Sequence, residues 1–150
     1  MTIHLREVTR DTVSVVCKLD AGDDHKQVAP NAVSIAQAHF QGEAWFRAVY
    51  DDERLVGFVM LYDPTLVEQP DEPDFFLWRL MIDQSHQGKG HGRAAVEALV
   101  DHVRTRPGAQ RLLVSHVKGV DRLGRFYQSI GFRYTGAEDG GELVMERILG

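Results

Sequence analysis

A glycine-rich segment of this chain reads Gln87-Gly88-Lys89-Gly90-His91-Gly92-Arg93. It follows an apolar run from Phe75 to Ile82, which predicts a buried strand, and it precedes a segment with helical periodicity. Glycines at alternate positions let the backbone adopt positive φ and approach a ligand closely. The helix that follows would begin with unpaired N–H groups and the positive end of its dipole. The segment therefore predicts a binding site for an anion such as phosphate.

Two common phosphate-binding loops do not match this segment. A P-loop requires Gly-x-x-x-x-Gly-Lys-Ser/Thr, whereas Gly90 follows the Gly88-Lys89 pair here. A dinucleotide fingerprint requires Gly-x-Gly-x-x-Gly, a spacing that Gly88, Gly90 and Gly92 do not supply. On these residues alone, a glycine turn that only reverses the chain is an equal alternative.

The composition is that of an ordinary globular domain, with 43% apolar and 26% charged residues in a chain of 150. No apolar run is long enough to span a membrane, and a signal peptide is not expected. The single cysteine, Cys17, cannot form an internal disulfide, which favours the cytoplasm. The net charge of −5 argues against a nucleic-acid partner, and the scattered histidines offer no metal-binding spacing.

The remaining patterns predict alternating strands and helices. Strands are predicted over residues 3–8, 45–50, 55–62, 75–82, 111–117, 132–136 and 143–148. Helices are predicted from residue 9 or 11 to 19, from 31 or 34 to 40, from the glycine segment to 104, and after 121 up to Gly131. This order predicts one α/β domain over residues 1–150, built on a mixed sheet.

Gln87, Gly90 and Gly92 match the Arg/Gln-x-x-Gly-x-Gly/Ala motif, so the chain resembles the GCN5-related N-acetyltransferase (GNAT) family. The resemblance implies the acyl-CoA N-acyltransferase fold, a mostly antiparallel sheet that splays between its fourth and fifth strands. It also implies that the co-substrate acetyl-CoA lies along the fourth strand, with its pyrophosphate on the turn amides. The implied acetyl-CoA-binding residues are Leu80, Met81, Ile82, Gln87, Gly88, Lys89, Gly90, His91, Gly92 and Arg93.

The family resemblance also assigns two catalytic roles. A free backbone N–H on the fourth strand, that of Leu80, would bind the thioester oxygen as negative charge develops on it. Residues 125–132 resemble the family signature in which a tyrosine, here Tyr127, protonates the departing sulfur. The alternative for Tyr127 is an amphipathic tyrosine of the core.

The general base has no obvious candidate, because Trp78 stands where related polyamine acetyltransferases carry a glutamate. His116 on the next strand, Glu72, Asp74 or an ordered water relay is expected to take the proton of the amine. A second departure is Val120, where many relatives carry an asparagine near the cofactor.

Residues 27–31 with 34–36, 56–60, and 78–83 leading into 87–90 resemble one bacterial branch of the family, the spermine/spermidine N-acetyltransferases. This likeness predicts acetyl transfer to a small-molecule amine, with Trp78 lining the acceptor pocket by cation–π contact. Acidic residues would bind the substrate's other ammonium groups, the candidates being Asp23, Asp24, Glu43, Glu72 and Asp74. The alternatives are another amine, such as an aminoglycoside or a peptide N-terminus, and a non-catalytic acetyl-CoA-binding domain. Homodimers are common in the family.

Overall fold

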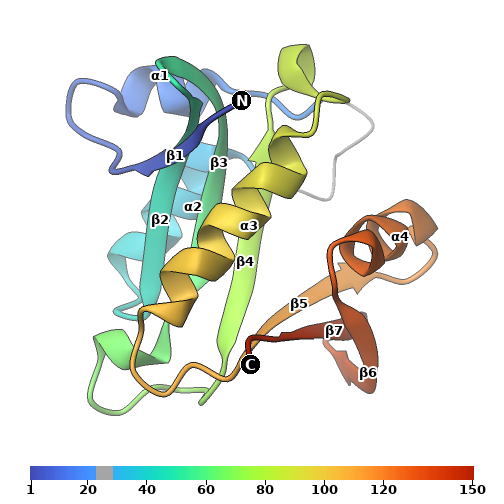
Figure 1. Ribbon diagram of the computed structural model, residues 1–150. Coiled ribbons are helices and arrows are strands. Elements are labelled where there is room, and N and C mark those ends of the chain that lie inside the picture. Colours follow the sequence, from blue (N-terminus) through green and yellow to red (C-terminus); the bar gives the residue numbers. More distant parts are fainter. Residues whose placement is uncertain (23–28) are drawn as a thin grey trace.

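The computed structural model describes residues 1–22 and 29–150 of the chain. Its centre is a seven-stranded sheet with the strand order β1-β2-β3-β4-β5-β7-β6 (Figure 1). Every neighbouring pair is antiparallel except β4 and β5, which run parallel. The strands are β1 (Ile3–Arg6), β2 (Ala44–Asp51), β3 (Arg54–Tyr62), β4 (Phe75–Ile82), β5 (Arg111–Val117), β6 (Arg133–Asp139) and β7 (Glu142–Ile148).

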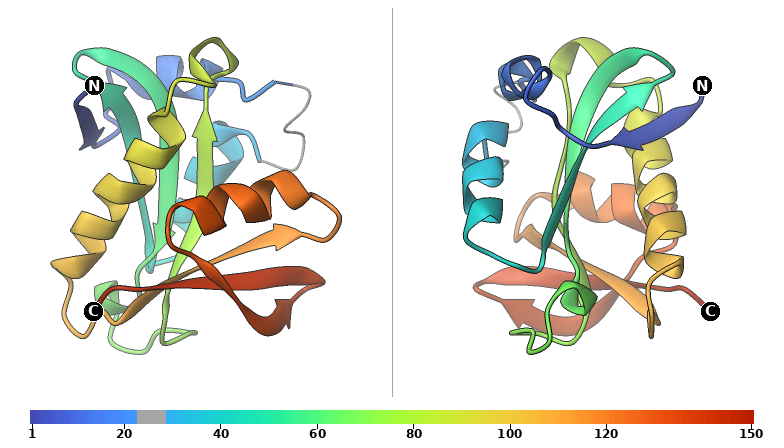
Figure 2. Two further views of the ribbon diagram at one scale, coloured as in Figure 1. Left: turned by 45° about the vertical axis from the view of Figure 1, so that its right-hand side comes forward. Right: turned by 90° about the vertical axis from the view of Figure 1, so that its left-hand side faces the viewer.

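Helices cover both faces of this sheet, as the two views of Figure 2 show. On one face, α1 (Val13–Lys18) and α2 (Asn31–His39) pack around a small core that includes Phe58 and Met60 of β3. On the other face, α3 (His91–Arg104) and α4 (Asp121–Ser129) share a larger core with side chains from β3, β4, β5 and β7. Within the described residues, short 3-10 helices span Pro64–Leu66 and Gln84–His86 in the connections. In the described part of the chain, no helix is both long and apolar enough to cross a membrane.

The sheet opens between β4 and β5. Their register includes only Phe75 with Leu112 and Phe76 with Leu113, after which the two strands diverge (Figure 1). On its other side, β4 pairs Arg79 with Met60 but Leu77 with Leu61. Trp78 is therefore an extra residue, a β-bulge, and bulges bend a strand and redirect its side chains. The observed α/β architecture, with its splay between the fourth and fifth strands, confirms the predicted fold.

The C-terminal hairpin differs from its prediction. The strand expected over residues 132–136 extends to Asp139, and β7 begins at Glu142, so the turn is only Gly140-Gly141. The register shifts from Tyr134 opposite Met145 to Glu138 opposite Leu143, which means that β6 carries extra residues. Glu138 and Asp139, which together with Gly140 and Gly141 suggested a longer turn, therefore belong to strand β6. Cross-strand pairing outweighs local turn preference here.

Candidate active site

The glycine turn connects the end of β4 to the start of α3. Gly88 and Gly90 have φ values of 76° and 88°, and Gly90 is the N-cap of α3. A Cβ at Gly88 would meet nothing, and one at Gly90 only Met1 Cε at 3.9 Å. Backbone conformation rather than space therefore requires glycine at both positions. Gly92 is different, because it lies inside the helix and a Cβ there would stand 3.4 Å from the Phe126 ring.

The turn is tied to the loop that follows α1. The Gln87 side-chain amide donates to the carbonyl oxygens of Ala21 and Ile82, both at 2.8 Å. One step earlier, the Asp83 carboxylate accepts a hydrogen bond of 2.8 Å from the Asp20 N–H. The Gln87 side chain therefore acts as a brace that holds the turn against β4, and its amide hydrogens are already used.

The backbone amides of this turn are available to a ligand. Within the described residues, the N–H groups of residues 88–93 donate no hydrogen bond, and the first amide that does is that of Ala94, to Gly90 O at 3.1 Å. Unpaired amides at a helix N-terminus point the same way as the helix dipole and favour an anion. This is the arrangement expected for a pyrophosphate cradle.

His91, the first residue of α3, is buried and carries a positive charge beside this cradle. Its Nδ1 lies 3.0 Å from the carbonyl oxygen of His86, and its Nε2 lies 3.0 Å from Asp51 Oδ2. A carbonyl and a carboxylate can only accept, so both ring nitrogens must donate and the ring is an imidazolium. The hydrogen bond from His91 in turn lowers the pKa of Asp51. The ion pair attaches the turn to the end of β2.

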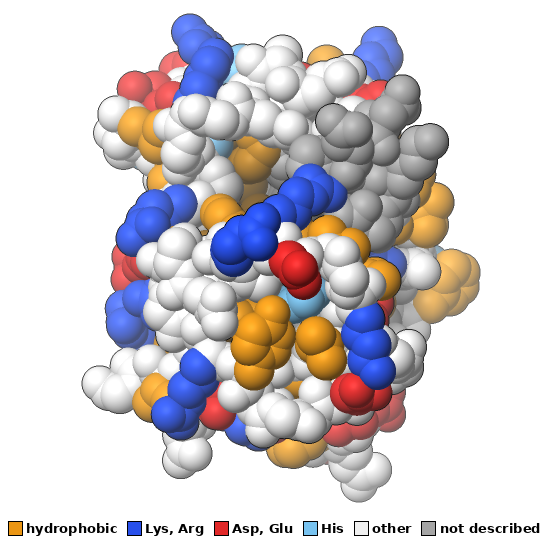
Figure 3. All heavy atoms as spheres, turned by 90° about the vertical axis from the view of Figure 1, so that its right-hand side faces the viewer, with side chains coloured by type: hydrophobic (Ala, Val, Ile, Leu, Met, Phe, Trp, Pro, Cys, Tyr) orange, Lys and Arg blue, Asp and Glu red, His pale blue; other side chains and the backbone are white. Residues whose placement is uncertain are grey.

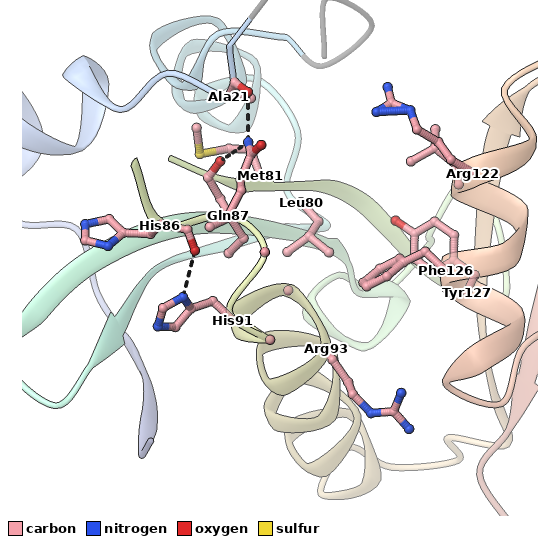
Figure 4. Close-up of a pocket in the computed structure, with 15 residues that line it drawn as sticks. Ala21, Leu80, Met81, His86, Gln87, His91, Arg93, Arg122, Phe126 and Tyr127 are labelled. Atoms are coloured by element: carbon pink, nitrogen blue, oxygen red, sulfur yellow. Dashed lines mark hydrogen bonds between the residues drawn. The ribbon is translucent and has the colours of Figure 1, made fainter. Parts of the chain in front are cut away.

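A pocket of about 430 Å³ opens over the turn and the free edge of β4 (Figure 4). Nine of the ten predicted acetyl-CoA-binding residues line it. The exception is Lys89, which is exposed on the outer side of the turn. Among the described residues that line the pocket, the basic ones are His86, His91, Arg93 and Arg122, and none is Asp or Glu. We call this the basic pocket.

Sequence reasoning missed the α4 side of the basic pocket. Arg122 and Phe126 line it one helical turn apart, with Leu123 and Tyr127 beside them. Residues four apart share a helix face, so this face could have been inferred from the position of Tyr127. In Figure 3, which shows this side of the molecule, basic side chains cross the middle of the face.

A second pocket, of about 450 Å³, shares Leu80, Leu123 and Tyr127 with the basic pocket. Its polar and aromatic lining includes Trp78, Arg79, Ser115, His116, Asp139 and Glu142. We call it the acceptor pocket. Leu80 and Tyr127 thus lie where the two pockets meet, at the opening between β4 and β5.

Tyr127 projects from α4 toward the opening. Its side chain is 8% exposed, and Figure 4 shows the hydroxyl directed to the space between α4 and Leu80. Its ring packs edge-on against Phe126 and Phe132. Burial raises the pKa of this phenol, so it keeps its proton at neutral pH.

His116 lines the acceptor pocket but both its ring nitrogens have partners. Nδ1 must donate to Val117 O at 2.9 Å, and Nε2 lies 2.8 Å from the Tyr134 hydroxyl, which can either donate or accept. The ring is 3% exposed and lies beneath α4, where a Cβ on Gly124 would stand 3.2 Å from Nε2. A proton from the acceptor pocket would reach Nε2 only after the Tyr134 hydrogen bond opens.

The predicted substrate-binding residues do not form one cluster. Trp78 lines the acceptor pocket and also a third groove of about 570 Å³, which contains Glu72 and Asp74. Asp74 is already paired with Arg111 at 3.0 Å. Asp23 and Asp24 lie outside the described residues. Val120 is the N-cap of α4, without a capping side chain.

Glu43 departs from its predicted role as a substrate-binding carboxylate. Its side chain is buried and lines none of these three pockets. It accepts hydrogen bonds of 3.0 Å from the Asp71 N–H and from the Tyr62 hydroxyl, and the first of these contributes most to lowering its pKa. The Glu43 carboxylate therefore stabilises the loop between β3 and β4 through these hydrogen bonds and does not face a ligand pocket. Among the residues described, no group of three or more His, Cys, Asp and Glu could hold a metal.

Residues 16–132 match the model of the Acetyltransferase (GNAT) family. The match covers most of the chain, and the protein belongs to this family of acetyltransferases. Two curated relatives are each 28% identical over 99% of this chain and 100% of their own length. They are a spermine/spermidine N(1)-acetyltransferase of Bacillus subtilis strain 168 and a probable spermine N(1)-acetyltransferase of Bacillus subtilis subsp. natto.

Solved structures share the fold at lower identity. The aminoglycoside acetyltransferase AAC(6')-Ib in complex with ribostamycin and coenzyme A superposes with a TM-score of 0.77 at 17% identity, covering 99% of this chain and 94% of that one. The PaiA N-acetyltransferase of Thermoplasma acidophilum, in complex with coenzyme A, gives 0.66 at 15% identity and covers 99% of each chain.

Proposed function

We propose that the protein transfers the acetyl group of acetyl-CoA to a primary amine of a polyamine such as spermidine or spermine. One observation carries this proposal: two pockets with different charge meet at Leu80 and Tyr127. The basic pocket suits a pyrophosphate, whereas Asp139 and Glu142 outnumber Arg79 in the acceptor pocket and suit a cation.

The residues of the basic pocket fit acetyl-CoA. The unpaired amides of residues 88–93 would bind the pyrophosphate, and His91, through its contacts with His86 and Asp51, holds the turn that presents them. Arg93 and Arg122 line the same pocket from α3 and α4. The edge of β4 that β5 leaves free, from Leu80 to Ile82, offers an apolar surface to the pantetheine arm.

In the proposed reaction a neutral amine from the acceptor pocket attacks the thioester carbon directly. A C–N bond forms, the backbone N–H of Leu80 stabilises the oxyanion, and the C–S bond breaks. Tyr127 gives its proton to the departing sulfur. In reference values a phenol near pKa 10 is a weaker acid than a thiol near 8.5, so this transfer is uphill by roughly 2 kcal/mol. Burial raises the pKa of Tyr127 further, so the transfer stays uphill unless the sulfur is buried as deeply and its pKa rises by as much.

The amine must lose a proton before it attacks. His116 remains a candidate base, but its Nε2 is engaged by Tyr134. Glu72 and Asp74 line the third groove rather than the pocket that contains Tyr127. We therefore favour a water molecule in the acceptor pocket, which passes the proton to solvent. The net reaction converts an ammonium and acetyl-CoA into an amide, free thiol and one proton.

The proposal is tested by thiol release from acetyl-CoA against spermidine, spermine, short diamines, an aminoglycoside and a short peptide. Turnover confined to polyamines is the expected result. Turnover confined to the aminoglycoside or to the peptide would assign the same chemistry to another amine. Binding of acetyl-CoA without turnover on any of these amines would contradict catalysis on them and favour a sensing domain.

A further inference from the structure

We infer that Glu142 selects acceptors with more than one positive charge, by pairing with the ammonium group next to the reacting amine. This inference rests on the proposed function. Glu142 is the first residue of β7 and was not among the acidic residues predicted to bind substrate. It enters the acceptor pocket because β6 and β7 pair up to Asp139 and Glu142.

The sheet fixes the direction of the Glu142 side chain. Glu142 stands opposite Val117 of β5, and its Oε1 accepts a 2.7 Å hydrogen bond from Ser115 Oγ. Ser115 and Val117 lie on one face of β5, and His116 lies on the other, beneath α4. Glu142 is therefore on the face away from α4, whereas the cofactor turn and Tyr127 approach from the α3 and α4 side.

The charge of Glu142 is not neutralised by an ion pair among the described residues. The nearest cation in the acceptor pocket is that of Arg79, whose guanidinium donates to Gln37 Oε1 at 3.1 Å and to Trp78 O at 3.3 Å. Burial lowers the pKa of Arg79, and the charge of Glu142 only opposes that effect. Glu138 on the same hairpin differs, because Lys118 contacts it at 2.7 Å.

The reaction requires that Glu142 pair with a neighbouring ammonium rather than the reacting one. A carboxylate beside an ammonium favours its charged form, which would hold the reacting nitrogen protonated and slow its attack. Pairing with the next ammonium along a polyamine gains binding without this penalty. The remaining positive charge also disfavours protonation of the reacting nitrogen. Glu142 thus distinguishes a polyamine from a monoamine of the same reactivity.

The test is Glu142→Gln, which removes the charge but keeps an oxygen to accept from Ser115. We expect KM for spermidine to rise about tenfold, the effect of losing one well-placed charge pair. The kcat for spermidine, the kcat/KM for a simple alkylamine and the affinity for acetyl-CoA should be unchanged. Glu138→Gln is the matched control, since its charge is already paired, and it should leave every constant unchanged.

Three outcomes would contradict the inference. An unchanged spermidine KM in Glu142→Gln would remove Glu142 from recognition. A fall in kcat of equal size for spermidine and the alkylamine would place Glu142 on the reacting nitrogen instead. An equal effect of Glu138→Gln would indicate a general surface-charge effect. Failure of the wild-type protein to acetylate any polyamine would instead contradict the proposed function, so the two failures are distinguishable.

Discussion

At the scale of single residues, the hydrogen-bonding role of each buried histidine depends on the groups that contact its ring. Both partners of His91 can only accept, which requires a donor at each ring nitrogen, whereas the Tyr134 hydroxyl beside His116 can donate or accept. The partners therefore fix the hydrogen-bonding role of both nitrogens in His91 but of only one nitrogen in His116.

Asp51→Asn tests the charge on His91. Without the carboxylate the imidazolium loses its partner, and acetyl-CoA affinity should fall about two- to five-fold, the usual worth of a charge at a helix end. Because His91 lowers the pKa of Asp51, Asp51 stabilises the fold above the ordinary carboxyl range and this stabilisation is lost as pH falls through the lowered value. Asp51→Asn should therefore melt below the wild type at neutral pH, with the gap closing in acid.

Asp52→Asn is the control for that experiment. Asp52 is adjacent and exposed, and its φ of 51° is one that asparagine also tolerates. Calorimetric titration with acetyl-CoA should show no change for this variant. Equal losses in the two variants would mean that the His91 ion pair does not position the turn.

Tyr127→Phe should lower kcat by about 10² while leaving acetyl-CoA affinity unchanged. Phenylalanine preserves the ring contacts with Phe126 and Phe132 and removes only the proton donor. Because burial raises the pKa of Tyr127, ionisation of this phenol should not limit the wild-type rate up to pH 10. A variant at full rate would show that water protonates the sulfur.

At the scale of elements, the functional features are interruptions of regular structure. A bulge at Trp78 and the divergence of β5 leave one edge of β4 open, and left-handed glycines start α3 with its amides unpaired. In a regular sheet and an ordinarily capped helix, these backbone N–H and C=O groups would bond to other groups of the protein. They would then be unavailable to hydrogen-bond a ligand.

Gly90→Ala tests the turn as an element. The space around Gly90 is open, so the cost comes from its φ of 88°, and a left-handed alanine costs about 1–2 kcal/mol. We expect acetyl-CoA affinity to fall about tenfold as the turn relaxes. Gly108→Ala carries a similar strain at φ 73° beyond the end of α3, and should lower the melting temperature without changing acetyl-CoA affinity.

At the scale of the whole molecule, the opening between β4 and β5 joins two pockets at Leu80 and Tyr127, and the proposed reaction brings one substrate into each. The single cysteine, Cys17, lies on α1 and lines neither the basic nor the acceptor pocket, so no thiol is placed to take the acetyl group. With direct attack by the amine, as proposed, both substrates should bind before any product leaves. Initial-velocity plots should intersect, and acetyl-CoA alone should not increase the mass of the protein. An acetylated protein that passes its acetyl group to spermidine would contradict direct transfer.

Local patterns in the chain were enough to predict the glycine turn, the order of elements and the position of Tyr127 before Gly131. Each of these depends on local pattern: positive-φ glycines, strand and helix periodicity, and a short segment before Gly131. Nine of the ten residues expected around acetyl-CoA line one pocket, because they lie close together along the end of β4, the turn and the start of α3.

Which of the dispersed charged residues line the site depends on the tertiary structure. Glu43 immediately precedes β2 and Glu142 begins β7, so their positions along the chain are similar. Glu43 accepts hydrogen bonds from Tyr62 and Asp71, whereas Glu142 lines the acceptor pocket. The difference lies in pairing between distant strands. A side chain's direction and its partners follow from register, and register depends on residues far apart in the chain.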